Sequence, residues 1–454
     1  MASPPIVSFL FSPLFSDAEV VKGFSDAQFV KAMLEVESAL ATVQGRLGII
    51  PAEAATKIVD VTANLEVDFE RLRNGVEKTG VPVIELVRQL REQVGDEAAD
   101  YVHWGATSQD IFDTARVLQT RAALTSLEAR LGSLIQNLSQ LADQHRHTLM
   151  AGRTHSQQAL PITFGFKIAG WLTPLLRHRE RLSEMKPRAL VVQFGGAVGT
   201  LASLGKSGIQ VQKALATELG LNLPPIPWHT QRDNMAELAS WLSLVSGSLA
   251  KMAQDVILLA QSEVGELRES DDVSRGGSST MPQKNNPIVS ELIITAARTN
   301  ASLLGSMHQA QIQEHERGTH GWQMEWLILP QMFTLTATAL NKALFLSQNL
   351  VVNEERMQKN VTASHGLMLA EAVSYALANT SVSKTRAHQL VKEASQVAVQ
   401  EDRHLIDALR EKTDASLNWE SLRDESAYLG STDTFIDRVL RAATALQQGQ
   451  EEVK

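Results

Sequence analysis

Leucines recur every three or four residues in the first half of the chain, which is the spacing of one buried face of an α-helix. The members of this series are Leu124, Leu127, Leu131, Leu134, Leu138 and Leu141. No proline interrupts the chain between Pro82 and Pro161, so nothing in that interval forces a helix to end. The pattern predicts one long helix that begins in the turn-rich stretch near Gly105.

A second broad apolar stripe begins near Asp233 and runs toward the glycines at 276 and 277. Its members are Leu238, Trp241, Leu242, Val245, Leu249, Met252, Val256 and Leu259. Alternating strand-like runs joined by hairpin turns are scarce, and no proline follows Pro330. The predicted fold class is therefore all-α, with three helical domains and long central helices packed as a bundle.

The chain has 454 residues, of which 44% are hydrophobic, so it can bury a large core and form about three domains of roughly 150 residues each. We place an N-terminal helical domain at 1–104, a central helix-bundle domain at 105–355 and a C-terminal helical domain at 356–454. The apolar stripes cover more than half of the circumference of each long helix. Composition alone leaves open whether a partner chain or this chain itself covers them.

Charge and composition narrow the classes of partner. The net charge of -9 is spread along the chain, without the basic stripe that binds a phosphate backbone, so no nucleic-acid partner is predicted. The absence of cysteine excludes disulfides and thiolate metal sites. The first fifteen residues contain no basic residue and are broken by prolines, and no later apolar run approaches the roughly 20 residues that span a bilayer. We therefore expect a cytoplasmic protein without a membrane partner.

The segment at 276–287 reads Gly-Gly-Ser-Ser-Thr-Met-Pro-Gln-Lys-Asn-Asn-Pro and is followed by Glu291. It joins a flexible stretch to a proline suited to the first turn of a helix. Backbone N–H groups and Lys284 could stabilise the alkoxide of a nearby serine enough for it to exchange a proton with carbon. A solvated Gly/Ser linker is the alternative interpretation.

Two further segments combine hydroxyl groups with a histidine. The segment 103–110, His-Trp-Gly-Ala-Thr-Ser-Gln-Asp, precedes the first long helix. Its hydroxyl groups and Asp110 could simply cap the free backbone N–H groups of that helix, or those N–H groups could bind a substrate carboxylate. The segment 152–159, Gly-Arg-Thr-His-Ser-Gln-Gln-Ala, is predicted to precede a helix punctuated by Pro161. His155 could transfer a proton near pH 7 or could be a hydrogen-bonded structural residue.

Segments 228–233 and 313–317 add cationic and polar groups, which could equally be surface charge beside core aromatics. Glu314, His315 and Glu316 are adjacent in sequence and would diverge on a helix. No spacing of histidine and carboxylate residues suggests a metal site.

Together these segments resemble the fumarase/aspartase superfamily. The pattern Ser-Ser-x-Met-Pro-x-Lys-x-Asn at 278–286 is similar to its signature, and segments 103–110 and 152–159 are similar to its two other active-site regions. Segment 29–51 resembles its N-terminal domain, so the resemblance covers nearly the whole chain. It implies a homotetramer whose active sites are each assembled from three subunits, a small polycarboxylate substrate and no cofactor.

The resemblance also implies residue roles. Ser278 would exchange a proton with the carbon beside a carboxylate, helped by Lys284. His155 would be a general acid or a substrate-orienting residue, held by Glu291. The predicted substrate-binding residues are His103, Thr107, Ser108, Arg153, Thr154, Gln157, Arg232, Asn286 and Arg317.

Segments 164–171 and 321–326 resemble the carboxymuconate cycloisomerase branch of this superfamily. That branch implies an isomerase of protocatechuate breakdown, in which one carboxylate adds to a carbon–carbon double bond to close a lactone and the alpha carbon is protonated. An adenylosuccinate lyase is the alternative enzyme. An inactive structural protein, like the lens crystallins related to this superfamily, is the alternative from another class.

Overall fold

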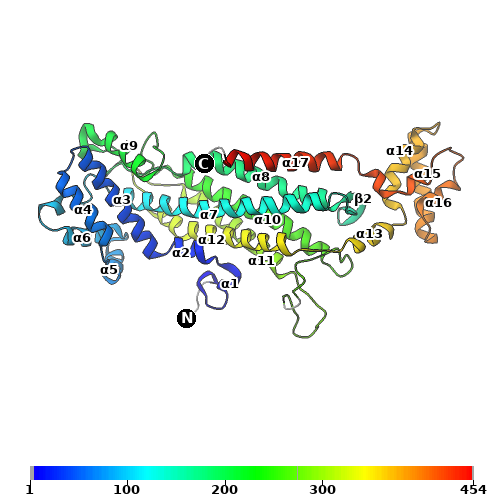
Figure 1. Cartoon of the computed structure of the whole chain (residues 1–454), viewed down its shortest axis with the longest axis horizontal. Coiled ribbons are helices and arrows are strands. Elements are labelled where there is room, and N and C mark those ends of the chain that lie inside the picture. Colours follow the sequence, from blue (N-terminus) through cyan, green and yellow to red (C-terminus); the bar gives the residue numbers. More distant parts are fainter. Residues whose placement is uncertain (1–4, 273–274, 452–454) are drawn as a thin grey trace. The chain divides into compact units, whose positions relative to one another are not determined.

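The computed structural model describes residues 5–272 and 275–451 (Figure 1). The α-helices are α1 (Ser12–Phe15), α2 (Ala18–Gly23), α3 (Asp26–Arg46), α4 (Ala52–Asn64), α5 (Phe69–Thr79), α6 (Val83–Val94), α7 (Ser108–Gln144), α8 (Phe164–Ala189), α9 (Gly208–Leu219), α10 (Asp233–Leu259), α11 (Ile288–Ala310), α12 (His320–Asn349), α13 (Glu354–Thr362), α14 (Ala370–Ala378), α15 (Lys384–Glu401), α16 (Leu405–Arg410) and α17 (Thr432–Glu451). The strands are β1 (Leu149–Thr154), β2 (Gln157–Thr163), β3 (Leu267–Arg268) and β4 (Val351–Val352). The 3-10 helices are η1 (Pro5–Val7), η2 (Glu97–Tyr101), η3 (Ala202–Ser207), η4 (Leu367–Leu369), η5 (Ser421–Arg423) and η6 (Glu425–Tyr428). The prediction of an all-α fold is confirmed.

Two compact units make up the chain. The first comprises Met1–Ala129, His178–Gly247 and Thr295–Leu340, and the second comprises the remaining residues. Five long helices are divided between the two units, so that each unit contains one part of α7, α8, α10, α11 and α12. The predicted division into three domains stays a prediction.

Both predicted long helices are present. α7 contains the leucine series, and its first five members, from Leu124 to Leu138, are each at most 1% exposed, whereas Leu141 is half-buried. α10 begins at Asp233, as its stripe predicted. Among the described residues α10 is also the one helix long and apolar enough to cross a membrane by length and composition, although the sequence showed no unbroken apolar run of that length. Because Leu242, Val245 and Leu249 are fully buried within the protein, we interpret α10 as a core helix.

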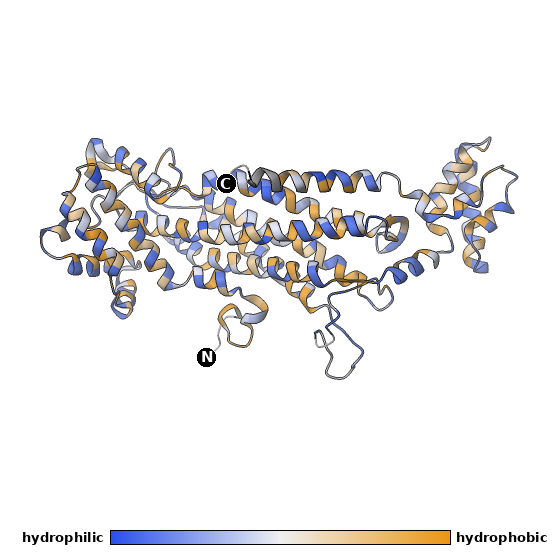
Figure 2. Cartoon of the chain, in the orientation of Figure 1, coloured by the Kyte–Doolittle hydropathy of each residue, from blue (hydrophilic) through white to orange (hydrophobic). Residues whose placement is uncertain are grey.

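Buried polar contacts connect the long helices within each unit. In the first unit the Asn300 side chain on α11 donates to the hydroxyls of Ser246 on α10 (3.2 Å) and Thr336 on α12 (2.9 Å). In the second unit the Trp171 indole on α8 donates to Asp255 on α10 at 2.7 Å. The long helices carry apolar residues in stripes with polar residues between them (Figure 2). Each unit is therefore built as a helix bundle with a few specific polar contacts.

The segment predicted to lead into a helix with Pro161 folds instead as a hairpin of β1 and β2. Pro161 lies in β2 opposite Ala151, and the helix starts later, at Phe164. His155 and Ser156 form the turn with φ values of 48° and 63°, which is the left-handed geometry of tight two-residue hairpins. Pro161 is tolerated because each strand of a two-stranded ribbon has an unpaired edge, where a missing N–H costs nothing.

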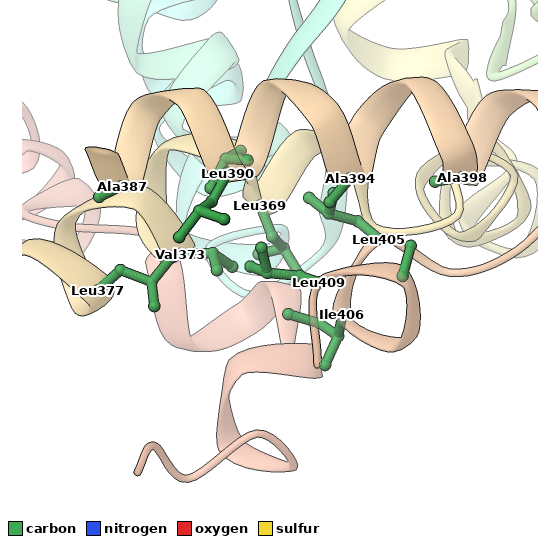
Figure 3. Close-up of a cluster of buried hydrophobic side chains, with 12 residues drawn as sticks. Leu369, Val373, Leu377, Ala387, Leu390, Ala394, Ala398, Leu405, Ile406 and Leu409 are labelled. Carbon is green, nitrogen blue, oxygen red and sulfur yellow. The ribbon is translucent and has the colours of Figure 1, made fainter. Parts of the chain in front are cut away.

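A separate apolar cluster stabilises the C-terminal helices of the second unit. It joins η4, α14, α15 and α16, and its larger members are Leu369, Val373, Leu377, Leu390, Val391, Leu405, Ile406 and Leu409. Figure 3 shows several of these side chains in the space between α15 and α16. Each is at most 5% exposed, so this region has a hydrophobic core of its own.

Candidate active site

The predicted site residues are divided between the two units. The first unit holds His103, Thr107, Ser108, Arg232 and Arg317. The second holds Arg153, Thr154, His155, Gln157, Ser278, Lys284, Asn286 and Glu291. We describe the two groups separately.

His103 lies in the loop before α7, with a positive φ of 64°. Its Nδ1 is 2.6 Å from the buried carboxylate of Glu37 on α3, and the histidine side chain is 16% exposed. Burial lowers the pKa of His103, but the charge and the hydrogen bond of Glu37 outweigh burial, so the net pKa is raised above its usual value. The pair therefore favours an imidazolium, which suits the binding of an anion.

Thr107 and Arg317 meet at the start of α7. One terminal nitrogen of Arg317 donates to the Thr107 hydroxyl at 2.6 Å, and its Nε donates to Gln109 Oε1 at 3.1 Å. Ser108, the first residue of α7, is half-buried. A substrate carboxylate at this place would meet hydroxyl and guanidinium donors beside the N-terminus of a 37-residue helix.

Asp110 organises the loops around this helix start. One of its oxygens accepts from the backbone N–H of Gly195 (3.0 Å) and from His229 Nε2 (2.7 Å), and the other accepts from the N–H of Gly196 (2.9 Å) and of Thr107 (3.0 Å). The carboxylate is fully buried. The sequence indicated Asp110 only as part of a helix cap, because its other partners, Gly195, Gly196 and His229, lie more than 80 positions away.

Arg232 is buried and fully engaged with carboxylates. Its Nη1 donates to Asp113 at 2.7 Å, its Nε donates to Glu325 at 2.8 Å, and its Nη2 contacts both. Burial lowers the pKa of Arg232, but the two carboxylates outweigh burial and raise it, so the residue stays cationic. The sequence predicted a contact with substrate. All three guanidinium nitrogens donate to these carboxylates, so Arg232 has an evident structural role, and its contact with substrate stays a prediction.

In the second unit Ser278 lies in a loop that is closed at its neck by Asn286. The backbone N–H and the side-chain Nδ2 of Asn286 both donate to Gly276 O, at 2.9 and 2.8 Å. Ser278 Oγ accepts from the backbone N–H groups of Thr280 (3.4 Å) and Met281 (3.2 Å). Amides aimed at a hydroxyl oxygen favour the build-up of negative charge on that oxygen.

The loop leads into α11, whose first free amides are capped by a carboxylate. Glu269 accepts from the backbone N–H groups of Val289 (3.0 Å) and Ser290 (2.6 Å). Lys284 is exposed in the loop, and Glu291 is exposed on the first turn of α11. Asn286 therefore has an evident structural role here, and its contact with substrate stays a prediction.

The hairpin turn presents exposed Thr154, His155 and Gln157 side chains. Beside the turn, Arg153 donates to the fully buried Glu266 through two nitrogens, at 2.6 and 3.0 Å. A histidine held at positive φ costs about 1–3 kcal/mol, and such strain is often found at functional sites. Within the described part of one chain no hydrogen bond joins His155 to the carboxylate predicted to hold it, so that pairing stays a prediction.

Comparison with known proteins places these motifs in a family. Residues 16–300 match the family model described as Lyase, and residues 366–439 match the model described as Adenylosuccinate lyase C-terminus. A 3-carboxy-cis,cis-muconate cycloisomerase of Pseudomonas aeruginosa is 44% identical, over 96% of this chain and 97% of its own length. Trans-aconitate decarboxylase 1 of Mycosarcoma maydis is 42% identical, over 94% of this chain and 88% of its own length.

A solved structure extends the agreement to three dimensions. The 3-carboxy-cis,cis-muconate lactonizing enzyme from Pseudomonas putida is 41% identical with a TM-score of 0.91, covering 97% of this chain and 100% of its own. Similarity of this degree over nearly the full length includes both units and all three motif segments. The chain therefore belongs to the fumarase/aspartase superfamily of lyases, as the motifs at 103–110, 152–159 and 278–286 predicted.

Proposed function

We propose that this protein is a cycloisomerase that converts 3-carboxy-cis,cis-muconate to 4-carboxymuconolactone. The observation that carries the proposal is 44% identity to a cycloisomerase across 96% of the chain. The reaction is an isomerisation that moves a proton and forms one carbon–oxygen bond, so it consumes no co-reactant.

In the lactonising direction one substrate carboxylate oxygen bonds to a carbon of a C=C bond conjugated with a second carboxylate. The π electrons move toward that second carboxylate, which becomes an aci-carboxylate with increased negative charge. Protonated His103 would stabilise this charge. The Arg317 guanidinium would bind a substrate carboxylate whose charge does not change during the reaction. The alpha carbon then takes up a proton that solvent ultimately supplies. The tricarboxylate thereby becomes a lactone with two carboxylates, and the two compounds are isomers when written as free acids.

We assign the proton transfer to Ser278, which gives its hydroxyl proton to the alpha carbon. The alkoxide left on Oγ would be stabilised by the N–H groups of Thr280 and Met281, which already donate to this oxygen. Lys284 would add a positive charge, and His155 would act as an acid or orient the substrate. Proton abstraction and β-elimination of a carboxylate are the reverse of the same steps.

We further propose a cytoplasmic homotetramer in which three subunits build each active site. Exposed apolar side chains on the long helices support an oligomer, since Leu244 and Leu258 on α10 are 48% and 42% exposed and Leu327 on α12 is 69% exposed. Light scattering after size-exclusion chromatography should give four times the chain mass of 49.7 kDa. A monomer would contradict this part of the proposal.

A substrate panel tests the proposed reaction. Purified protein is assayed by ultraviolet absorbance with 3-carboxy-cis,cis-muconate, cis,cis-muconate and adenylosuccinate, and by CO2 release with trans-aconitate. We expect rapid turnover of 3-carboxymuconate alone. Trans-aconitate is included because a trans-aconitate decarboxylase is 42% identical, and CO2 release without lactone formation would replace the proposal by decarboxylation.

Replacing the proposed acid tests the role of the loop serine. Ser278→Ala should lower kcat by about 100-fold to 10,000-fold, the usual contribution of a positioned acid or base, with little change in KM. The neighbouring Ser279 is exposed, and Ser279→Ala is the matched control with near-normal turnover. Near-normal turnover of Ser278→Ala would exclude this serine as the proton donor.

A further inference from the structure

We infer that Gln109 is a positioning residue that holds Arg317 in the orientation in which it meets a substrate carboxylate. The inference rests on the proposed function in one respect, the contact between Arg317 and the substrate. Gln109 is fully buried on the first turn of α7, so it acts on the substrate through the arginine and does not touch it.

The partners of the Gln109 amide determine which way it points. Its oxygen accepts from Arg317 Nε (3.1 Å) and from the backbone N–H of Gly318 (3.3 Å), and both of these groups are donors only. Its nitrogen donates to Asp113 Oδ2 (3.2 Å) and to the backbone oxygen of His229 (2.9 Å), and both of these are acceptors only. A flipped amide would place donor against donor at one end and acceptor against acceptor at the other. The amide oxygen is therefore held toward the arginine.

The partner carboxylate is itself immobilised. Asp113 is 2% exposed and accepts from the Trp322 indole at 2.8 Å and from Arg232 at 2.7 Å. These contacts continue to Glu325, which binds the same arginine. Gln109 thus connects a rigid, buried ion cluster to the half-buried guanidinium of Arg317.

The hydrogen-bonding groups of Arg317 and Thr107 that are still available to a ligand are donors. Because an arginine can only donate, the Thr107 hydroxyl must accept from Arg317 Nη1, and its own proton stays available for another acceptor. In the described part of the chain Arg317 Nη2 has no hydrogen-bond partner. A guanidinium fixed through Nε and Nη1 therefore offers N–H and O–H groups together, which selects a carboxylate over a neutral or cationic group.

Kinetics of a double-mutant cycle test the inference. Gln109→Met keeps the length of the side chain and removes both hydrogen-bonding ends. We expect KM for 3-carboxymuconate to rise by about tenfold with kcat within about threefold, as for the loss of a contact used equally in ground and transition states. In an Arg317→Met background the same change should alter KM by less than about twofold, since the positioned group is already gone.

Controls separate positioning from general damage. Gln212 is also buried in the first unit and donates to the backbone oxygen of Phe194, so Gln212→Met is the matched control, with KM within about twofold of wild type. If Gln109→Met does not fold, Gln109→Asn replaces it, because the shorter amide cannot reach both Arg317 and Asp113. Equal effects of the Gln109 change in both backgrounds would overturn the inference.

A crystal structure of Gln109→Met provides a readout that does not depend on turnover. We expect Arg317 to leave Thr107 by about 1 Å or more, a displacement that matters for binding geometry. An unmoved Arg317 would overturn the inference. If the wild-type enzyme fails in the substrate panel while Arg317 moves as expected, the proposed reaction fails and the positioning role stands.

Discussion

The buried ion cluster of the first unit allows a quantitative prediction about stability. Arg232 is 2% exposed and lies between Asp113, also 2% exposed, and Glu325, 6% exposed. Arg116 is a further cation near this cluster, because the charges of Asp113 and Glu325 both act on it. Burial outweighs their attraction and lowers the pKa of Arg116 to about 10, so Arg116 is still charged at neutral pH. The change Arg232→Met keeps an unbranched apolar chain and leaves two buried carboxylates with one cation.

Loss of one partner from a buried ion pair typically costs 3–5 kcal/mol, because the remaining charge can no longer be solvated or neutralised. We expect a loss of about 3–5 kcal/mol in the free energy of unfolding for Arg232→Met. In the double variant Arg232→Met/Glu325→Gln the charges of Asp113 and Arg116 balance again. That variant should recover about 2 kcal/mol or more relative to the single change.

Urea unfolding followed by circular dichroism at one protein concentration measures these differences, since any assembly would make stability depend on concentration. Arg188→Met is the matched control, because Arg188 forms a similar two-nitrogen pair with Glu237 but is 58% exposed. The control should cost less than about 1 kcal/mol. Equal costs for the two Arg→Met changes would refute the argument from burial. Additive losses in the double variant would refute the argument from charge balance.

Two other predictions concern the loop neck and the pair before α7. Gly276 has a φ of +70°, and a Cβ there would lie 2.3 Å from a backbone oxygen, so Gly276→Ala should lower kcat at least about tenfold through distortion of the loop. Gly277 has no atom within 4 Å of an added Cβ, so Gly277→Ala is the matched control, and similar kcat values for the two would contradict the reasoning. Glu37→Gln removes the charge that, against burial, raises the pKa of His103. The stability that this pair contributes is complete below the unfolded pKa of histidine, about 6.5, and is lost as pH rises through the folded pKa. The difference in unfolding free energy between wild type and Glu37→Gln should therefore be larger at pH 6 than at pH 9, and an equal difference would contradict the raised pKa.

The helical part of the fold was predictable because its signal is local. A side chain's burial on a helix repeats every three to four residues, so the leucines of α7 and the stripe of α10 indicated both helices before any contact was known. The hairpin at β1 and β2 was not predicted. His155 and Ser156 are not the glycine or asparagine residues that usually mark such a turn, and Pro161 in β2 is a residue that argues against a strand.

The site residues, too, were predictable only as far as the local sequence identifies them. The motif segments were recognisable as residue types in order, and each contains groups suited to an anion or a proton transfer. The partners of those groups were not recognisable. Nothing near Arg232 in the sequence indicates that it binds Asp113, 119 positions away, and Glu325, 93 positions away.

The amino-acid sequence by itself determined the helical class, the starts of two long helices, α7 and α10, and the three motif segments that indicate the superfamily. Only the tertiary structure decided that Arg232 binds two carboxylates in a buried ion cluster, that Asp110 accepts hydrogen bonds from three loops and that the Gln109 amide oxygen faces Arg317. The physical reason is that periodicity reports whether a side chain is buried. Which charge or amide it meets there depends on chain segments brought together by folding.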